Sequence, residues 1–255
     1  MAFNYFTFDG RSLEEFGFVI SKMPDYEVAN RKRSFNYSND LTETELVDGG
    51  YYENVKISYI IKSLPTRVHC SNRELVQKLV DWLMPNTTYH SLSDSFTPNA
   101  YTKAVCTGVT KVQNLSKGIV SATVSFSRQP FWYIDNSIEI VDGANSTTYY
   151  FDNPTKFSSK PLVIVRANLN SNTLRIDINE ANLEIPPNYL DEEVEIIFDT
   201  QTGNISMGGE NINYRIVNFD YTPTFTTGTN TVLIRRVGST STIPYIKIDP
   251  RWKQL

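Results

Sequence analysis

Four carboxylates that lie close together could take part in acid and base chemistry: Asp191, Glu192, Glu193 and Glu195. A pair of such groups is what a glycosidase uses to cleave its substrate. The cluster leads into the apolar stretch Val194 to Phe198, and runs of like charge usually form a solvated turn or strand face. We therefore expect a turn and the solvent face of a strand here, and no catalytic pair.

Two further places have some of the residues of a metal site. Asp177 opens a stretch that begins like a calcium loop, but Asn182 stands where glycine is needed and Asn188 where glutamate is needed. His69 and Cys70 are adjacent, yet no second His or Cys follows at a ligand spacing. The sequence predicts neither a metal site nor a cofactor site.

The sequence also lacks the motifs of common enzymes. No G-x-S-x-G, H-E-x-x-H, P-loop or G-x-G-x-x-G occurs. Both histidines lie in the first half, so the second half cannot hold a Ser-His-Asp site. We expect a protein that is not an enzyme.

Composition favours a β-rich protein that does not hold nucleic acid. Aromatic residues make up 13% of the chain, and many Thr, Ser and Asn flank β-branched runs. The net charge is −4, which argues against the basic surface that nucleic acid requires. Residues 1–133 carry +1 and residues 134–255 carry −5, an asymmetry typical of two domains.

Targeting signals and membrane spans are not expected. The first residues lack the basic region and apolar run of a signal peptide, and no apolar run approaches the length of a membrane span. Cys70 and Cys106 could form one bridge, but they are interpreted as isolated thiols in a reducing compartment. The expected location is the inside of a cell until the protein is released.

One helix and two clear strands are predicted in the first half. Ser71 and Glu74 form a capping box, and an apolar stripe follows until Pro85, which predicts a helix over about 71–84. Apolar and polar residues alternate at residues 55–61 and 120–126, as in half-buried strands. A further strand is expected near residues 101–107, followed by a long connection.

The second half is predicted to be an antiparallel β-sandwich or jelly roll. Short apolar stretches recur at even intervals with Gly, Pro and Asn between them, and no helix signal is present. The expected strands are Leu162 to Arg166, Leu174 to Ile178, Val194 to Phe198, Tyr214 to Val217, Val232 to Arg236 and Tyr245 to Ile248.

The two halves meet at residues 126–133, here called the junction segment. Pro130 cannot donate to a sheet and is followed by three aromatic residues that need cover. A simple proline exit from a strand would give the same local pattern. We interpret the segment as a plug between a domain at 1–133 and a domain at 134–255. The residues expected to set the angle between them are Arg128, Pro130, Phe131 and Trp132.

A polar, acidic stretch between Asn36 and Gly50 is too long for a tight turn. We expect it to project from the first domain as a hairpin or loop that contacts a neighbouring subunit. The candidate interface residues are Asp40, Glu43, Glu45, Asp48, Gly49 and Gly50.

Several segments, in order along nearly the whole chain, resemble the distal tail protein family of long-tailed bacteriophages. Residues 8–17 are similar to its opening F-N-G-x-x-L-x-D-F-G, with Asp9 for Asn and Glu15 for Asp. Residues 45–50 depart from the G-x-D/N-G turn expected there. The other matching segments are the helix with Trp82 and Leu83, the F-x-x-x-P-F part of the junction segment, the N-P-T and K-P-x-I-x-V stretches at 153–155 and 160–165, and residues 199–208, 228–230 and 250–252.

The resemblance implies a mainly β fold with one α-helix in an N-terminal ring-forming domain and a galectin-like sandwich at the C-terminus. It implies a hexameric ring in the tail tip or baseplate that serves as a host attachment hub. The implied partners are the tail tube protein, a tail-tip fibre or lysin protein and a receptor-binding protein, with DNA only as passing cargo and no membrane. The implied location is the virion, after assembly in the bacterial cytoplasm.

A lectin-like role of the sandwich is the alternative. Sugar sites usually present an aromatic platform with convergent polar groups. The second half has no histidine, its one tryptophan is Trp252, and the His-Asn-Arg and Trp-Glu-Arg strings of galectins are missing. The sequence therefore favours assembly over direct sugar binding.

Overall fold

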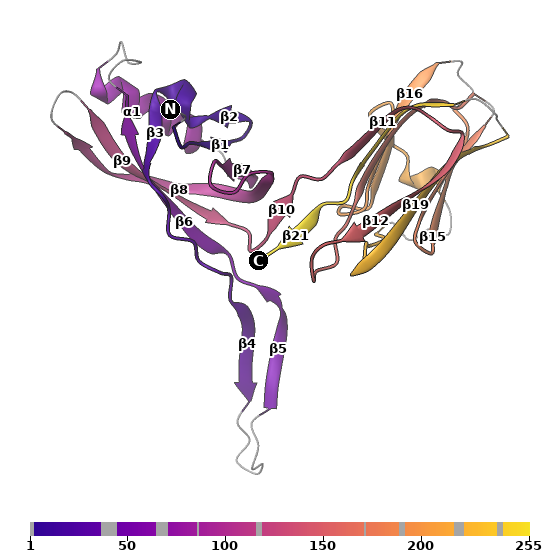
Figure 1. Cartoon of the computed structure of the whole chain (residues 1–255), viewed down its shortest axis with the longest axis horizontal. Helices are drawn as coiled ribbons and strands as arrows, with labels where there is room; N and C mark the ends of the chain where they lie inside the picture. Colours follow the sequence, from indigo (N-terminus) through magenta and orange to yellow (C-terminus); the bar gives the residue numbers. More distant parts are fainter. Residues whose placement is uncertain are drawn as a thin grey trace. The chain divides into compact units, whose positions relative to one another are not determined.

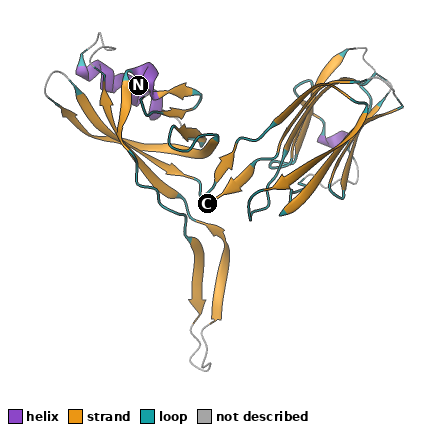
Figure 2. Cartoon of the chain, viewed as in Figure 1, coloured by secondary structure: helices purple, strands orange, loops and turns teal. Residues whose placement is uncertain are grey.

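The chain forms two compact units, each with its own sheets and core (Figure 1). The computed structural model describes residues 3–36, 45–64, 71–85, 87–115, 119–170, 172–188, 192–216, 222–238 and 242–255. The first unit is Met1–Trp132 with Leu255, and the second is Tyr133–Gln254. In its described residues the chain is mainly β with one α-helix and antiparallel sheets, which confirms the expected fold class (Figure 2).

The first unit is built on an antiparallel sheet with the strand order β2-β1-β7-β8-β9-β6-β3. Asp9 and Gly10 connect β1 to β2 with positive φ angles of 52° and 74°, the geometry of a tight hairpin turn. The strands are β1 (Phe6–Phe8), β2 (Arg11–Ser12), β3 (Phe18–Lys22), β6 (Val55–Ser63), β7 (His90–Asp94), β8 (Ala100–Asn114) and β9 (Val120–Arg128).

The predicted helix is present as α1 (Asn72–Leu83). The capping box forms as expected: the Ser71 hydroxyl accepts from the Glu74 amide, and Glu74 accepts from the Ser71 amide. Trp82 stacks on Phe6 with 5.8 Å between the ring centroids, so the helix covers the core of this sheet. A short 3₁₀ helix, η1 (Leu13–Phe16), ends at Gly17 with a φ of 76°, a conformation that favours glycine.

Two strands of the first unit form a separate two-stranded sheet, here called the arm. They are β4 (Arg31–Asn36) and β5 (Glu45–Tyr52), paired antiparallel from Arg31 with Tyr52 to Asn36 with Glu45. In Figure 1 the arm leads away from the main sheet of this unit. The predicted hairpin is thus confirmed for its two paired strands, and residues 37–44 lie outside the described part of the chain.

The second unit is an antiparallel β-sandwich. One sheet has the order β11-β20-β13-β16-β17-β18 and the other the order β12-β19-β14-β15. Inward side chains of both sheets, such as Val163, Phe198, Ile176 and Ile234, share one buried core. The strands are β11 (Ile138–Gly143), β12 (Ser146–Asn153), β13 (Leu162–Asn168), β14 (Thr173–Ile178), β15 (Ala181–Ile185), β16 (Glu193–Asp199), β17 (Asn204–Met207), β18 (Glu210–Asn211), β19 (Gly228–Val237) and β20 (Ile243–Asp249).

Two expectations about these elements were wrong. The stretch predicted as a strand at Tyr214 is a 3₁₀ helix, η4 (Asn213–Arg215), in which Tyr214 is 81% exposed and so lacks the inward face of a strand. The connection expected after residue 107 is the second part of β8, which runs to Asn114 and pairs with β9 across two register shifts. These shifts interrupt the alternation from which a strand would be predicted.

Cys106 is a buried free thiol, and burial raises its pKa. Cys70 lies outside the described residues, as does His69. Among the described helices, none has both the length and the apolar character that a membrane crossing requires.

Candidate functional site

The described residues of the arm are largely exposed. Arg31, Lys32 and Arg33 on β4 are all exposed, and Tyr51 on β5 is 55% exposed. Lys32 pairs with Glu53 at 3.1 Å, a bridge between two half-exposed side chains. Of the arm residues whose side chains the structure describes, none belongs to either hydrophobic core.

The predicted interface residues divide between described and undescribed positions. Asp40 and Glu43 lie outside the described residues. The other four candidates, Glu45, Asp48, Gly49 and Gly50, all lie on β5, and the backbone of Asp48 pairs with that of Arg33. Gly50 has a φ of 73°, which favours glycine at this position. Their role as a subunit interface stays a prediction.

Arg128 of the junction segment binds the root of the arm. Its side chain is 2% exposed, and the guanidinium donates to the carbonyls of Gln129 at 3.1 Å and Pro130 at 3.0 Å. A third bond, at 2.9 Å, reaches the carbonyl of Glu27 in the segment that precedes β4. The guanidinium also lies over the ring of Trp132, 5.3 Å from its centroid. Arg128 thus ties the end of β9 to the chain that enters the arm.

A second tie on the same segment is centred on Asp94, the last residue of β7. Its carboxylate accepts from the hydroxyl of Tyr26 at 3.0 Å and from that of Tyr59 at 2.7 Å. The amides of Phe96 and Thr97 donate to its other oxygen. The carboxylate is 94% buried by this arrangement, because the residue is only 6% exposed. Tyr26 is thereby held next to Glu27, the residue that Arg128 binds.

The strand that leaves the arm is also held at its root. The ring of Tyr52 packs against that of Phe131 in an edge contact, 5.5 Å between centroids. The amide of Glu53 donates to the carbonyl of Asn30 at 3.0 Å, which closes the arm. Both ends of the arm therefore contact the junction segment or the residues beside it.

The predicted junction residues therefore lie close together, and the contacts described above are with the root of the arm. Trp132 is 6% exposed and belongs to the core of the first unit, whereas Pro130 and Phe131 are half-buried. Whether they also set an angle between the units stays a prediction. Sequence reasoning did not find Tyr26 and Asp94, because their contacts join residues 68 and 35 positions apart, and no local pattern encodes such distances.

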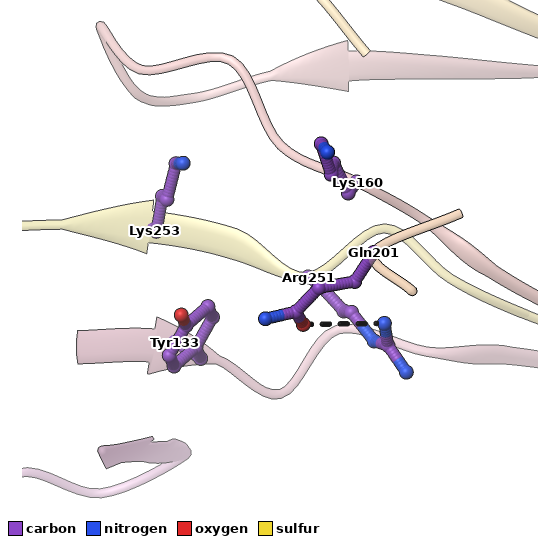
Figure 3. A pocket seen from close by; sticks show the side chains of 5 residues that line it. All are labelled: Tyr133, Lys160, Gln201, Arg251 and Lys253. Atoms are coloured by element: carbon purple, nitrogen blue, oxygen red, sulfur yellow. Dashed lines mark hydrogen bonds between the residues drawn. The ribbon is translucent and has the colours of Figure 1, made fainter. Parts of the chain in front are cut away.

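The second unit has a small basic pocket with a volume of about 70 Å³. Figure 3 shows its lining, in which Arg251 donates weakly to the Gln201 side chain at 3.5 Å. Arg251 also pairs with Asp199 at 2.6 Å, and its backbone has a φ of 52°. None of these residues was singled out from the sequence. The lining residues are Tyr133, Lys160, Gln201, Arg251 and Lys253, the last on β21 (Trp252–Gln254).

Two members of the acidic cluster, Glu193 and Glu195, lie on β16. Glu193 is exposed on β16, and Glu195 accepts from Arg166 at 2.9 Å. Asp177, the first residue of the rejected calcium loop, pairs with Arg175 at 2.7 Å. Asp191 lies outside the described residues. Within the described ranges, no group of three or more His, Cys, Asp or Glu side chains is placed to hold a metal ion.

The comparisons with known proteins point to one fold. The sequence matches no family model and no curated protein. The crystal structure of the SPP1 Dit protein, described as a paradigm of the hub adsorption apparatus in phages that infect Gram-positive bacteria, is similar over 100% of both chains. Its TM-score is 0.65 at 11% sequence identity.

Two structures of BuGH86, the wild type and a variant, each in complex with neoagarooctaose, also match. They cover 81% of this chain and 35% of theirs, with 11% identity and TM-scores of 0.18, which carry no argument. The chain therefore shares the fold of a phage tail hub protein, from its first unit through its second.

Proposed function

We propose that this chain is a structural component of the tail tip or baseplate of a long-tailed phage. Six copies form a ring that joins the tail tube to the tail-tip and receptor-binding proteins and lets DNA pass. The observation that carries the proposal is the similarity of fold to the SPP1 Dit protein over the full length of both chains. No catalytic role and no cofactor are part of the proposal.

In this proposal the arm makes the contact between subunits. A two-stranded sheet with exposed side chains has little stability of its own, since an isolated hairpin is marginally stable in water. A neighbouring subunit would cover it. The clamp formed by Arg128, Asp94 and Phe131 supports this role, because a contact arm must leave the body of the protein in a fixed direction.

The finer parts of the proposal concern partners and place. The ring docks on the tail tube protein on one side and on a tail-tip fibre or lysin protein on the other. The second unit, a galectin-like sandwich, carries the receptor-binding protein, so the assembled ring is a host attachment hub. The protein assembles in the bacterial cytoplasm and resides in the virion. The two antiparallel sheets around one core are compatible with a galectin-like form.

Electron microscopy of the purified protein, combined with light scattering, tests the ring. We expect rings with a central hole and a mass of about 175 kDa, six times the 29.1 kDa of the chain. Monomers at all concentrations would contradict the ring. Monomers that bind a glycan array would favour the lectin-like alternative.

A deletion tests the role of the arm. Removal of Asp40 to Asp48 should give a folded protein that no longer forms the ring, because the deletion takes away the first half of β5 while leaving both cores complete. The control is Val112→Ser on β8, another exposed position, at which the ring should persist. An intact ring after the deletion would show that the arm is not the subunit contact.

A further inference from the structure

The small pocket of the second unit gathers three cationic side chains around one space. Lys160, Arg251 and Lys253 line it, together with the polar side chains of Tyr133 and Gln201 (Figure 3). Its volume of about 70 Å³ is several times the roughly 10–15 Å³ that one water molecule needs. The space therefore suits a small polyatomic group better than a large organic ligand.

Both an ion pair and a repulsion between like charges occur around this space. Asp199 pairs with Arg251 at 2.6 Å, and the amide of Arg251 donates to Asp249. The pKa of Lys253 lies below its ordinary value because of burial and then because of the like charge of Lys160. Two lysines that repel each other in a half-buried place are a cost to the fold that an anion between them would remove.

The side chains that line the pocket carry hydrogen-bond donors of the kind that bind oxyanions. Ammonium groups and a guanidinium make shorter and stronger bonds to anionic oxygens than neutral donors make. The Tyr133 hydroxyl and the Gln201 amide are further polar groups at its wall. We propose that the pocket lined by Lys160, Arg251 and Lys253 binds one oxyanion group of the size of a carboxylate or phosphate. The site goes beyond the proposed ring and does not depend on it.

Two sources could supply such a group: free phosphate, or the acidic side chain of a partner protein. Scanning calorimetry of the full chain distinguishes them with sodium phosphate and sodium acetate as probes, each against sodium chloride of equal ionic strength. A ligand that binds only the folded form raises the unfolding midpoint as its concentration rises. A rise with phosphate alone indicates free phosphate, and a rise with acetate indicates a carboxylate.

Lysine variants locate the effect. We expect Lys160→Met and Lys253→Met each to weaken the anion affinity about tenfold or more, since each removes a charged donor. Lys160→Arg should keep the response. The matched control is Lys156→Met, an exposed lysine of the same unit that does not line the pocket and should respond like the wild type.

Without anion, Lys160→Met should unfold at the same temperature as the wild type or higher, because it removes the repulsion on Lys253. Equal midpoints in phosphate, acetate and chloride would overturn the site. The site would also be overturned if the anion raised the unfolding midpoint of Lys160→Met and Lys253→Met as much as that of Lys156→Met. The oligomeric state, measured on the same samples, should not change in any of these variants, so failure of the site and failure of the ring are separate results.

Discussion

At the scale of single residues, Asp94 shows how a buried charge is used in this chain. An ionised carboxylate is an acceptor only, and here both oxygens are engaged, one by two tyrosine hydroxyls and one by two backbone amides. Burial without these partners would cost several kcal/mol. The satisfied carboxylate instead connects β6, β7 and the segment before the arm, three parts of the chain that are distant in sequence.

The hydroxyls around Asp94 predict how stability depends on alkaline pH. Burial, and then the charge of Asp94, raises the pKa of Tyr59 well above its ordinary value. Burial and the same carboxylate raise the pKa of Tyr26 to about 12. An unfolded tyrosine titrates at about 10. The folded pKa values are therefore the higher ones, and the stability they contribute is present below pH 10 and is lost as pH rises toward 12 and beyond.

The variant Tyr59→Phe tests this dependence. At pH 7 it should lower the free energy of unfolding by about 1–3 kcal/mol, since a buried acceptor loses a donor. Between pH 9 and 12 its stability should fall less than that of the wild type, because one titrating hydroxyl is gone. Urea unfolding at a series of pH values measures both effects. Tyr150→Phe, at a position 72% exposed, is the control and should leave the curve unchanged. If the free energy of unfolding of Tyr59→Phe fell between pH 9 and 12 as much as that of the wild type, the link between Tyr59 titration and stability would be contradicted.

At the scale of elements, Arg128 is one of several residues that hold the root of the arm. Arg128 reaches the carbonyls of the next two residues and, through its other terminal nitrogen, the distant carbonyl of Glu27, an arrangement that suits the fork of a guanidinium. A lysine carries its three donors on a single nitrogen, so it lacks the spread of the planar fork and cannot lie over the ring of Trp132 in the same way. The hydrogen bond to the Glu27 carbonyl is the one that positions the arm, because Glu27 precedes β4 by only a few residues.

We therefore expect Arg128→Lys to loosen the arm. The global free energy of unfolding of the first unit should fall by about 1.5–3 kcal/mol, as for the loss of buried hydrogen bonds made by a charged group. Hydrogen exchange should rise more at residues 23–30 and on β4 and β5 than in α1, a local effect that a general loss of stability would not produce. Arg33→Lys on the exposed face of β4 is the matched control. Equal increases in α1 and the arm would show that Arg128 does not position the arm.

The elements differ in how well local sequence predicts them. β6 and β9 are predictable because every second side chain is buried, and α1 because its cap and apolar stripe agree. β11 and β12 lie at sheet edges, where Val141 and Tyr150 are more than 70% exposed, so burial does not impose a clear alternation. β7 is not predictable from its sequence, because the stretch His90–Asp94 is largely polar. Its inward position at Asp94 is held by hydrogen bonds to a carboxylate and not by burial of an apolar side chain.

At the scale of the whole molecule, the candidate sites are made by contacts that no short stretch of sequence contains. The basic pocket joins residues from 133 to 253, and the clamp joins residues 27 and 128. Sequence patterns located the arm and the junction segment as unusual stretches, but only the side-chain contacts of Arg128 and Phe131 show that one holds the other. The division into a β-rich first half and a sandwich was readable because turn signals and charge both change between the halves.

The two buried cores predict that the units unfold independently. The first core includes Trp132 and the second includes Ile196, and none of the described residues belongs to both. Calorimetry of the full chain should therefore show two transitions. Trp132→Ala should destabilise the first unit by about 3–5 kcal/mol, and Ile196→Ala the second by about 2–5 kcal/mol, from lost burial and the cavities left behind.

The two variants serve as controls for each other. Trp132→Ala should lower the midpoint of one transition and leave the other in place, and Ile196→Ala should do the reverse, because cores that share no side chains couple weakly. A single transition that both variants lower would mean that the units unfold as one body. In that case the junction residues would have to transmit stability between the cores, and Phe131→Ala, which removes a half-buried ring packed on Tyr52, would then lower the same transition.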